Sequence, residues 1–146
     1  MKAEDLMIGD WVNLNFDVDY KTGNSIYGHV QVASINKDGT IDVDCTFDNS
    51  KSMQDGWHLK LIEPIPLTPE ILEKNGILYR KPSFYYIIND DKDLECTHYI
   101  YQTIQEDWVI GVDTGAYECS VFARIQYVHE LQHALKLCRI DKEIVV

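Results

Sequence analysis

The chain of 146 residues carries a formal net charge of −11, which comes from 24 acidic and 13 basic residues. Nucleic-acid binding requires lysine and arginine side chains that neutralise phosphates, so this balance argues against a nucleic-acid partner. Hydrophobic residues make up 45% of the chain, which is enough to bury a core without disulfides or structural metal. An acidic chain could also mimic nucleic acid and occupy a basic protein, and this alternative stays open.

The cysteines and the absence of long apolar runs favour a reducing, cytoplasmic location. Cys45, Cys96, Cys119 and Cys138 form no C-x-x-C pattern, and three of them lie in apolar periodic segments, as reduced core thiols do. A Cys96–Cys119 bridge between neighbouring strands is the alternative. The opening MKAEDLMIGDWV lacks the apolar run of a signal peptide, and no stretch reaches the roughly 18 apolar residues of a membrane span. We therefore expect no membrane partner.

Residues 1–64 show the pattern of several short β-strands. Gly9-Asp10 turns the chain into the first strand, and Asp38-Gly39 predicts a hairpin turn. Short strand patterns, mostly alternating apolar and polar residues, occupy four segments: residues 10–16, 27–35, 40–47 and 57–65. Residues 1–64 therefore resemble an SH3-like small β-barrel, a resemblance of architecture that carries no activity with it.

A proline-rich joint and a short helix are predicted next. Pro64 and Pro66 disfavour regular structure, whereas Thr68 can cap a helix whose first position is Pro69. Gly76 is a natural terminator, so the helix has only about two turns. The joint is too short and too apolar for a free linker, and we expect the two halves of the chain to pack as one compact unit.

Residues 65–146 predict an α+β domain with an antiparallel sheet and two helices. The expected strands occupy residues 83–89, 94–104, 108–113 and 119–125. A terminal helix should run from about Gln126 to Cys138. The predicted fold class is therefore α+β, with an SH3-like small β-barrel followed by an antiparallel sheet, a short helix and a C-terminal helix.

The terminal helix contains a sequence that matches the H-E-x-x-H pattern of zinc peptidases, from His129 to His133. In such sites two histidines one helical turn apart hold one zinc ion, and the glutamate deprotonates the bound water. His129, Glu130 and His133 match that pattern in residue type and spacing. A zinc-dependent hydrolase is therefore the alternative hypothesis for function.

Helix geometry and the missing ligand argue against that hypothesis. At about 100° per residue, His129 and His133 point almost directly away from the apolar stripe, so we expect both to face water. Arg139 occupies the position six residues after His133, where one class of these enzymes has its third ligand. We therefore predict no catalytic, cofactor-binding or metal-binding residue. Adventitious binding of nickel or zinc by the histidine pair remains open.

Two segments resemble a family of small uncharacterised proteins of gut bacteria, which are often encoded near prophage and other mobile-element genes. They are IPLTPEILEKNG (65–76) and IQYVHELQHALKLCRID (125–141), and the resemblance covers essentially the whole chain. It implies that glutamine often replaces Glu130 and asparagine often replaces His133, which is incompatible with obligatory zinc hydrolysis. The family has no established activity, so no functional residue is transferred.

Other candidate sites have weaker patterns. Residues 17–23 and 89–95 are acidic but lack the ligand spacing of a calcium loop, which favours polar turns. Tyr99, Tyr101 and Thr103 share one face of a strand, which is either open to a partner or covered by the terminal helix. Four aromatic residues of the first half could form a peptide groove or fill the core and rim of a barrel: Trp11, Tyr20, Tyr27 and Trp57.

The sequence as a whole favours a non-enzymatic protein-binding or adaptor protein of a prophage or mobile element. The sequence contains no recognisable set of catalytic residues, and its first half resembles a barrel. The family resemblance implies a gene near prophage or mobile-element genes. We expect the partner to be a protein. The zinc hydrolase and the nucleic-acid mimic are the alternatives, and the sequence predicts neither the oligomeric state nor the partner's identity.

Overall fold

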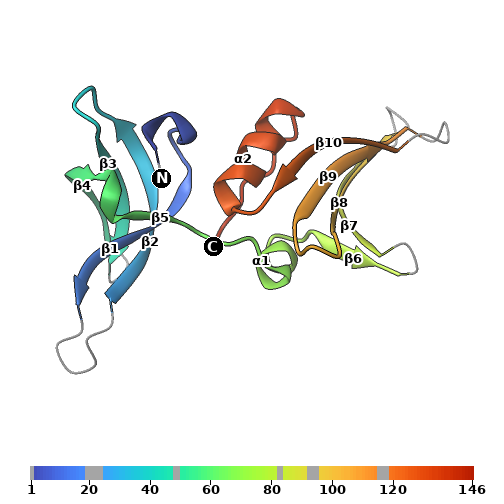
Figure 1. Cartoon of the computed structure of the whole chain (residues 1–146), viewed down its shortest axis with the longest axis horizontal. Coiled ribbons are helices and arrows are strands. Elements are labelled where there is room, and N and C mark those ends of the chain that lie inside the picture. The colour runs from blue at the N-terminus through green and yellow to red at the C-terminus, as the bar shows by residue number, and fades with distance from the viewer. Residues whose placement is uncertain (1, 19–24, 48–49, 82–83, 92–95, 115–118) are drawn as a thin grey trace. The chain divides into compact units, whose positions relative to one another are not determined.

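The computed structural model describes residues 2–18, 25–47, 50–81, 84–91, 96–114 and 119–146. Side chains are described in these ranges except at residues 16–18, 25–27, 45–47, 50–55, 89–91, 119 and 122. The chain divides into two compact units, Met1–Ile65 and Pro66–Val146. Each unit contains a five-stranded antiparallel sheet, and the second also contains helices α1 and α2 (Figure 1). The predicted α+β class is confirmed.

The first sheet is a meander followed by a returning strand. Its order is β4-β3-β2-β1-β5, and a 3-10 turn, Leu59–Leu61, leads from β4 into β5. In the described pairings β4 and β5 are the two edges of the sheet, so no barrel closure is seen there. The strand bounds are β1 (Trp11–Val18), β2 (Ser25–Ile35), β3 (Thr40–Phe47), β4 (Ser50–His58) and β5 (Ile62–Pro64).

The prediction of one strand over residues 57–65 is wrong. The segment contains the end of β4, the 3-10 turn and the short strand β5. The sequence of β4 is SKSMQDGWH, and most of it precedes residue 57. This sequence lacks an alternating apolar pattern. The pairing of β4 with β3, from Phe47↔Ser50 to Thr40↔His58, makes it a strand although its local sequence does not predict one.

Alternate residues of the first three strands form the core of the first unit. Val12 lies opposite Val30 in the β1–β2 pairing, and Val32 lies opposite Val43 in the β2–β3 pairing. Because side chains alternate between faces of a strand, these pairs place their apolar residues on one side of the sheet. The buried cluster comprises Leu6, Val12, Leu14, Val30, Val32, Ile41, Val43 and Ile62.

The turn that precedes β1 is confirmed at Gly9 and Asp10. Gly9 has a φ of +90°, a left-handed conformation that favours glycine. Its N–H donates to the Val32 carbonyl at 2.7 Å, and the Val32 N–H donates to the Asp10 carbonyl at 3.0 Å. The Asp10 carboxylate accepts the Met7 N–H at 2.7 Å. These bonds attach the turn to the side of β2.

A carboxylate on β3 organises the hairpin between β2 and β3. Asp42 Oδ2 accepts a hydrogen bond from Ser34 Oγ at 2.5 Å, and Oδ1 accepts from Asn36 Nδ2 and from the Gly56 N–H, each at 3.0 Å. These donors, with the Ser34 hydroxyl first, lower the pKa of Asp42 below its ordinary value of 3.8. The carboxylate thus joins three strands of the first sheet.

Acidification is expected to weaken the first unit through Asp42. Because the pKa of Asp42 is lowered in the folded state, its contribution to the free energy of unfolding is complete above the ordinary value of 3.8. The contribution is lost as the pH falls through the lowered folded-state value. Thermal unfolding between about pH 5 and pH 2 should show a smaller decline for Asp42→Asn than for the unchanged chain.

The control for this prediction is Asp44→Asn, which removes an equal charge from an exposed position of the same strand. This variant should keep the decline of the unchanged protein. Equal declines in all three proteins would contradict a special role of Asp42.

The second sheet has the order β10-β9-β8-β7-β6. Four of its strands match the predicted segments, whereas the sequence pattern does not predict β6. The three residues of β6 are all exposed, and they are held by pairs such as Tyr79↔Tyr86 with β7. The element bounds are α1 (Pro69–Lys74), β6 (Leu78–Arg80), β7 (Tyr85–Asp91), β8 (Cys96–Gln102), β9 (Trp108–Asp113), β10 (Cys119–Ile125) and α2 (Val128–Leu137).

Helix α1 begins and ends at the residues that the sequence predicts. Thr68 Oγ1 accepts the Ile71 N–H at 3.4 Å, and Pro69 takes the first helical position. At the other end, the Asn75 side chain exchanges two hydrogen bonds with the backbone of Val145, each 2.8 Å long. Lys142 Nζ donates to the Asn75 carbonyl at 3.0 Å. Asn75 therefore fixes the last residues of the chain against the end of α1.

Candidate functional site

The histidine pair of α2 does not lie as predicted. His129 is only 5% exposed, so the expectation that both histidines face water is wrong for this residue, and His133 is half-buried. The His129 ring stacks on Tyr127, with centroids 5.8 Å apart and an interplanar angle of 11°. It also lies edge-on to His133 at 5.8 Å. Aromatic neighbours on the same helix thus cover part of a polar ring that the apolar stripe does not include.

Glu130 caps the helix. Its Oε2 accepts the backbone N–H groups of Gln126 at 2.6 Å and of Tyr127 at 3.1 Å. These N–H groups precede the first turn of α2, where a helix supplies no acceptor of its own and where a negative charge is favourable. The glutamate of the H-E-x-x-H pattern therefore has a structural role that requires no metal.

The histidines have no third donor that would complete a zinc site within the described part of the chain. No group of three or more His, Cys, Asp or Glu side chains there is close enough to hold a metal ion. Catalytic zinc sites have three protein ligands and an open position for water. The two imidazoles alone offer a weak, two-ligand site.

Replacing Glu130 with alanine is expected to lower the free energy of unfolding by about 1 kcal/mol, because the carboxylate caps two N–H groups. The zinc content of the purified protein, measured without a histidine tag, should not change. His133→Ala is the control for metal binding and should leave zinc content equally unchanged. One zinc ion per chain, lost in His133→Ala, would contradict this interpretation.

The remaining candidates of the first half are only partly described. Trp57 is half-buried and packs against the core of the first sheet, and Trp11 is also half-buried. The side chains of Tyr20 and Tyr27 lie outside the described residues, and so does the predicted groove of all four aromatics. Of the two acidic segments, residues 19–23 and 92–95 lie outside the described residues, as do the side chains of 17–18 and 89–91.

Cys96 and Cys138 are free thiols, and both are half-buried. Burial raises the pKa of the Cys138 thiol, which disfavours the reactive thiolate. The side chains of Cys45 and Cys119 lie outside the described residues. The predicted alternative, a Cys96–Cys119 bridge, is not formed because Cys96 is free.

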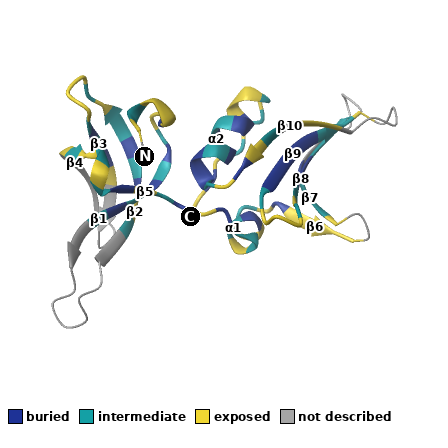
Figure 2. Ribbon diagram, in the orientation of Figure 1, coloured by how far each residue is buried: buried dark blue, intermediate teal, exposed yellow. Residues whose placement is uncertain are grey.

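The two faces of the second sheet differ in their surroundings. Ile100 of β8 lies opposite Ile110 of β9, and Trp108 shares their face by alternation. The Trp108 indole N–H donates to the Leu67 carbonyl at 2.9 Å, just before α1. Figure 1 shows α1 and α2 beside the same side of the sheet, and Figure 2 shows that β9 is buried along most of its length. This face is the core of the second unit.

The opposite face carries a hollow of about 490 Å³, which we call the tyrosine pocket. No residue of α2 lines it, so the terminal helix does not cover the face of Tyr99 and Tyr101. Thr103, the third residue of the predicted strand face, lies beyond the end of β8 and does not line the hollow. The lining residues are Phe84, Tyr85, Tyr99, Tyr101, Gln102, Asp113 and Val121.

The tyrosine rings form a continuous aromatic surface. The Tyr85 and Tyr99 rings are 5.3 Å apart, and the Tyr99 and Tyr101 rings stack at 6.2 Å with an angle of 28°. Tyr99 is 6% exposed, and its direct cross-strand neighbour is Gly111. A Cβ atom at position 111 would lie only 2.7 Å from the Tyr99 hydroxyl oxygen, so the ring fits over the glycine because the side chain is absent.

The rim of the tyrosine pocket contains exposed apolar residues. Phe84 is 74% exposed and Val121 is 53% exposed. Phe84 also has a φ of +58°, a left-handed conformation that is strained for a bulky residue. Sequence reasoning missed Phe84, Tyr85, Asp113 and Val121. The available signals were the aromatic run Phe84-Tyr85-Tyr86 and the glycine within β9.

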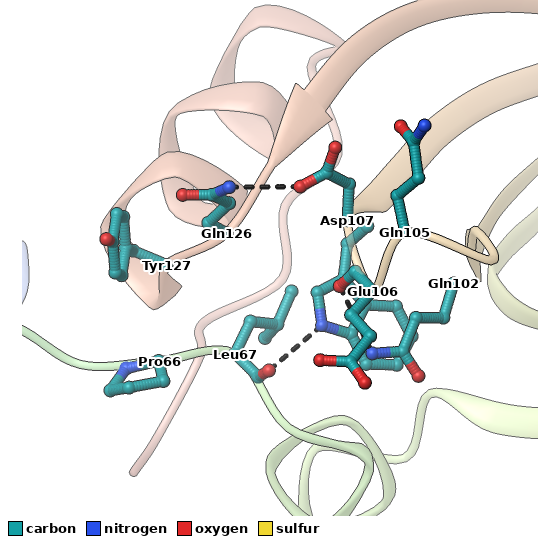
Figure 3. A pocket seen from close by; sticks show the side chains of 9 residues that line it. Pro66, Leu67, Gln102, Gln105, Glu106, Asp107, Gln126 and Tyr127 are labelled. Atoms are coloured by element: carbon teal, nitrogen blue, oxygen red, sulfur yellow. Dashed lines mark hydrogen bonds between the residues drawn. The ribbon is translucent and has the colours of Figure 1, made fainter.

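A second hollow of about 370 Å³ lies near the turn between β8 and β9 (Figure 3). Two local hydrogen bonds join polar residues of its lining: Gln126 Nε2 donates to Asp107 Oδ1 at 3.0 Å, and Gln102 Nε2 donates to the Glu106 carbonyl at 3.2 Å. The Trp108–Leu67 hydrogen bond joins two further residues of its lining. The bonds of Asp107 and Trp108 attach this turn to the residues just before α2 and α1. The residues of the second hollow therefore have a structural role.

No family model, curated protein or solved structure matches the chain. Among the described helices, none has the length and apolar character needed to cross a membrane. The tyrosine pocket is therefore the best candidate site on its geometry alone.

Proposed function

We propose that the protein is a non-catalytic binding protein whose tyrosine pocket receives a segment of a protein partner. The observation that carries this proposal is an aromatic hollow on the sheet face opposite Trp108, with exposed apolar residues at its rim. Tyrosine and phenylalanine are enriched at the centres of protein interfaces. Apolar residues scattered singly over a surface are normal, whereas a contiguous exposed apolar patch marks an interaction site. The proposed role as an adaptor of a prophage or mobile element rests on the sequence resemblance alone.

The rigidity of the aromatic surface supports binding. Tyr99 is held between Tyr85 and Tyr101 and lies over Gly111, so few rotamers remain to be lost when a partner arrives. Tyrosine supplies a large contact area at low entropic cost because it has only two side-chain torsions. A surface that is already ordered avoids part of the free energy that association costs.

The proposal is tested by photo-crosslinking in the cells that produce the protein. A benzophenone amino acid placed at Val121, at the rim, should crosslink a discrete protein. The same amino acid at Leu137, which is 83% exposed on α2, is the control and should not crosslink that protein. Combining Tyr101→Ala with the benzophenone at Val121 should abolish the crosslink, while the thermal unfolding midpoint shows that the sheet remains folded.

Two results would contradict the proposal. The first is equal crosslinking from Val121 and from Leu137, which would indicate a nonspecific encounter. The second is a partner captured from Val121 whose yield is unaffected by Tyr101→Ala in a folded protein, because the partner would then bind without using the pocket.

A further inference from the structure

We infer that the tyrosine pocket binds an arginine side chain from a basic segment of the partner. This inference rests on the proposed function and adds the chemistry of the bound group. The evidence for this inference is that aromatic rings and a carboxylate line the same hollow. Phe84 and three tyrosines supply the rings, and Asp113 supplies the negative charge.

Aromatic rings attract cations through the negative charge of their faces. A cation within about 6 Å of a ring centroid gains this attraction, and arginine is the most frequent cation in such contacts. The Tyr99 ring is 6% exposed and lies 5.3 Å from the Tyr85 ring and 6.2 Å from the Tyr101 ring, so the half-buried Tyr85 and Tyr101 rings are the ones that a cation can reach. A planar guanidinium can stack on one ring while its N–H groups reach outward.

The charges around the tyrosine pocket favour a cation. Among the residues that the structure describes, no lysine, arginine or histidine lines it, and Asp113 is its one charged lining residue. The net charge of −11 for the whole chain also attracts a basic segment at long range.

The size of the hollow fits a side chain with a stretch of backbone. Its volume of about 490 Å³ lies in the range of sites that enclose small ligands. Besides the phenol oxygens, the Asp113 carboxylate is the hydrogen-bond acceptor that the described lining supplies. Arginine satisfies both parts of this lining, because its stem is apolar and its fork of N–H groups matches a carboxylate. A proline-rich segment would use the rings but would bring no positive charge to the carboxylate.

The test uses three synthetic peptides with the full chain. The first is acetyl-Gly-Ser-Arg-Ser-Gly-amide, the second has citrulline in place of arginine, and the third has proline there. Citrulline is the neutral isostere of arginine, so the pair isolates the charge. Binding is followed by the shifts of backbone amide resonances in nitrogen-15-labelled protein. We expect the arginine peptide to shift the amides of Tyr99, Tyr101 and Gly111 and to bind about 2- to 30-fold more tightly than the citrulline peptide.

Two variants examine the pocket residues. Tyr101→Leu keeps apolar volume but removes one ring face, and Asp113→Asn removes the charge at nearly constant size. Each should weaken the arginine peptide while leaving the citrulline peptide nearly unchanged. Tyr79→Leu is the matched control, because Tyr79 contacts Tyr86 on the other face of the sheet and does not line the pocket.

The outcomes separate this inference from the proposed function. Equal binding of the arginine, citrulline and proline peptides at these amides overturns the inference but supports a peptide-binding face. A preference for the proline peptide also overturns it. Shifts of other amides only, or no shifts with the arginine peptide, overturn it as well, and the crosslinking experiment then decides the proposed function independently.

Discussion

Replacing Trp108 with alanine is expected to lower the free energy of unfolding of the second unit by about 3–5 kcal/mol. Trp108 is 3% exposed, and its ring lies edge-on to Tyr86 at 5.8 Å. Its N–H also binds the Leu67 carbonyl, so the substitution leaves a cavity and removes the donor from a buried acceptor. Denaturant unfolding followed by circular dichroism measures the loss.

Trp108→Phe separates the two parts of this effect. Phenylalanine keeps most of the ring volume but cannot donate to Leu67, so we expect a loss of about 1–3 kcal/mol. If alanine and phenylalanine caused equal losses, packing of the indole would contribute little, and the interpretation of Trp108 as a core residue would be wrong.

Substituting Gly111 with valine is expected to destabilise the second sheet by at least about 1–3 kcal/mol and to displace the Tyr99 ring. A Cβ atom there would lie 2.7 Å from the Tyr99 hydroxyl oxygen and 2.9 Å from the Ser120 carbonyl oxygen. The tyrosine ring can move, whereas the Ser120 carbonyl belongs to the backbone of β10 and moves only with the strand. Thermal unfolding measures the stability, and the amide shifts of Tyr99 and Tyr101 report the displacement.

A double-mutant cycle assigns the two contacts. Combining Gly111→Ala with Tyr99→Leu should cost less than the sum of the single substitutions, with a coupling of about 0.5–3 kcal/mol, because the clash with the hydroxyl no longer exists. The part of the Gly111→Ala loss that remains belongs to the Ser120 carbonyl. Strict additivity of the two substitutions would show that the ring does not press on position 111.

The strands that alternation predicts are the ones whose apolar residues face a core. Val30 and Val32 lie two positions apart and are both buried, and such a pattern is visible from the sequence alone. Strands β4 and β6 lie at sheet edges and lack this pattern, because β6 is wholly exposed and β4 is rich in polar residues. Their positions depend on pairing with a neighbour, which local sequence does not encode.

The candidate site is harder to predict for a related reason. Tyr99 and Tyr101 are recognisable as one face of a strand, but the pocket also needs Tyr85 and Val121 from other strands, together with Gly111 under a ring. Cross-strand register, which brings these residues together, is a long-range property. Conversely, the burial of His129 does not follow from the helical wheel, since the wheel ignores stacking on Tyr127.

The hydrogen bonds between Asn75 and Val145 have a consequence for protein synthesis. They join residues 70 positions apart, whereas the last pairing of the first sheet, Val12↔Pro64, is available once residue 65 has left the ribosome. Chains emerge from the N-terminus, and early domains fold first. The first unit can therefore assemble during translation, while the end of α1 meets its partner only after Val145 has emerged.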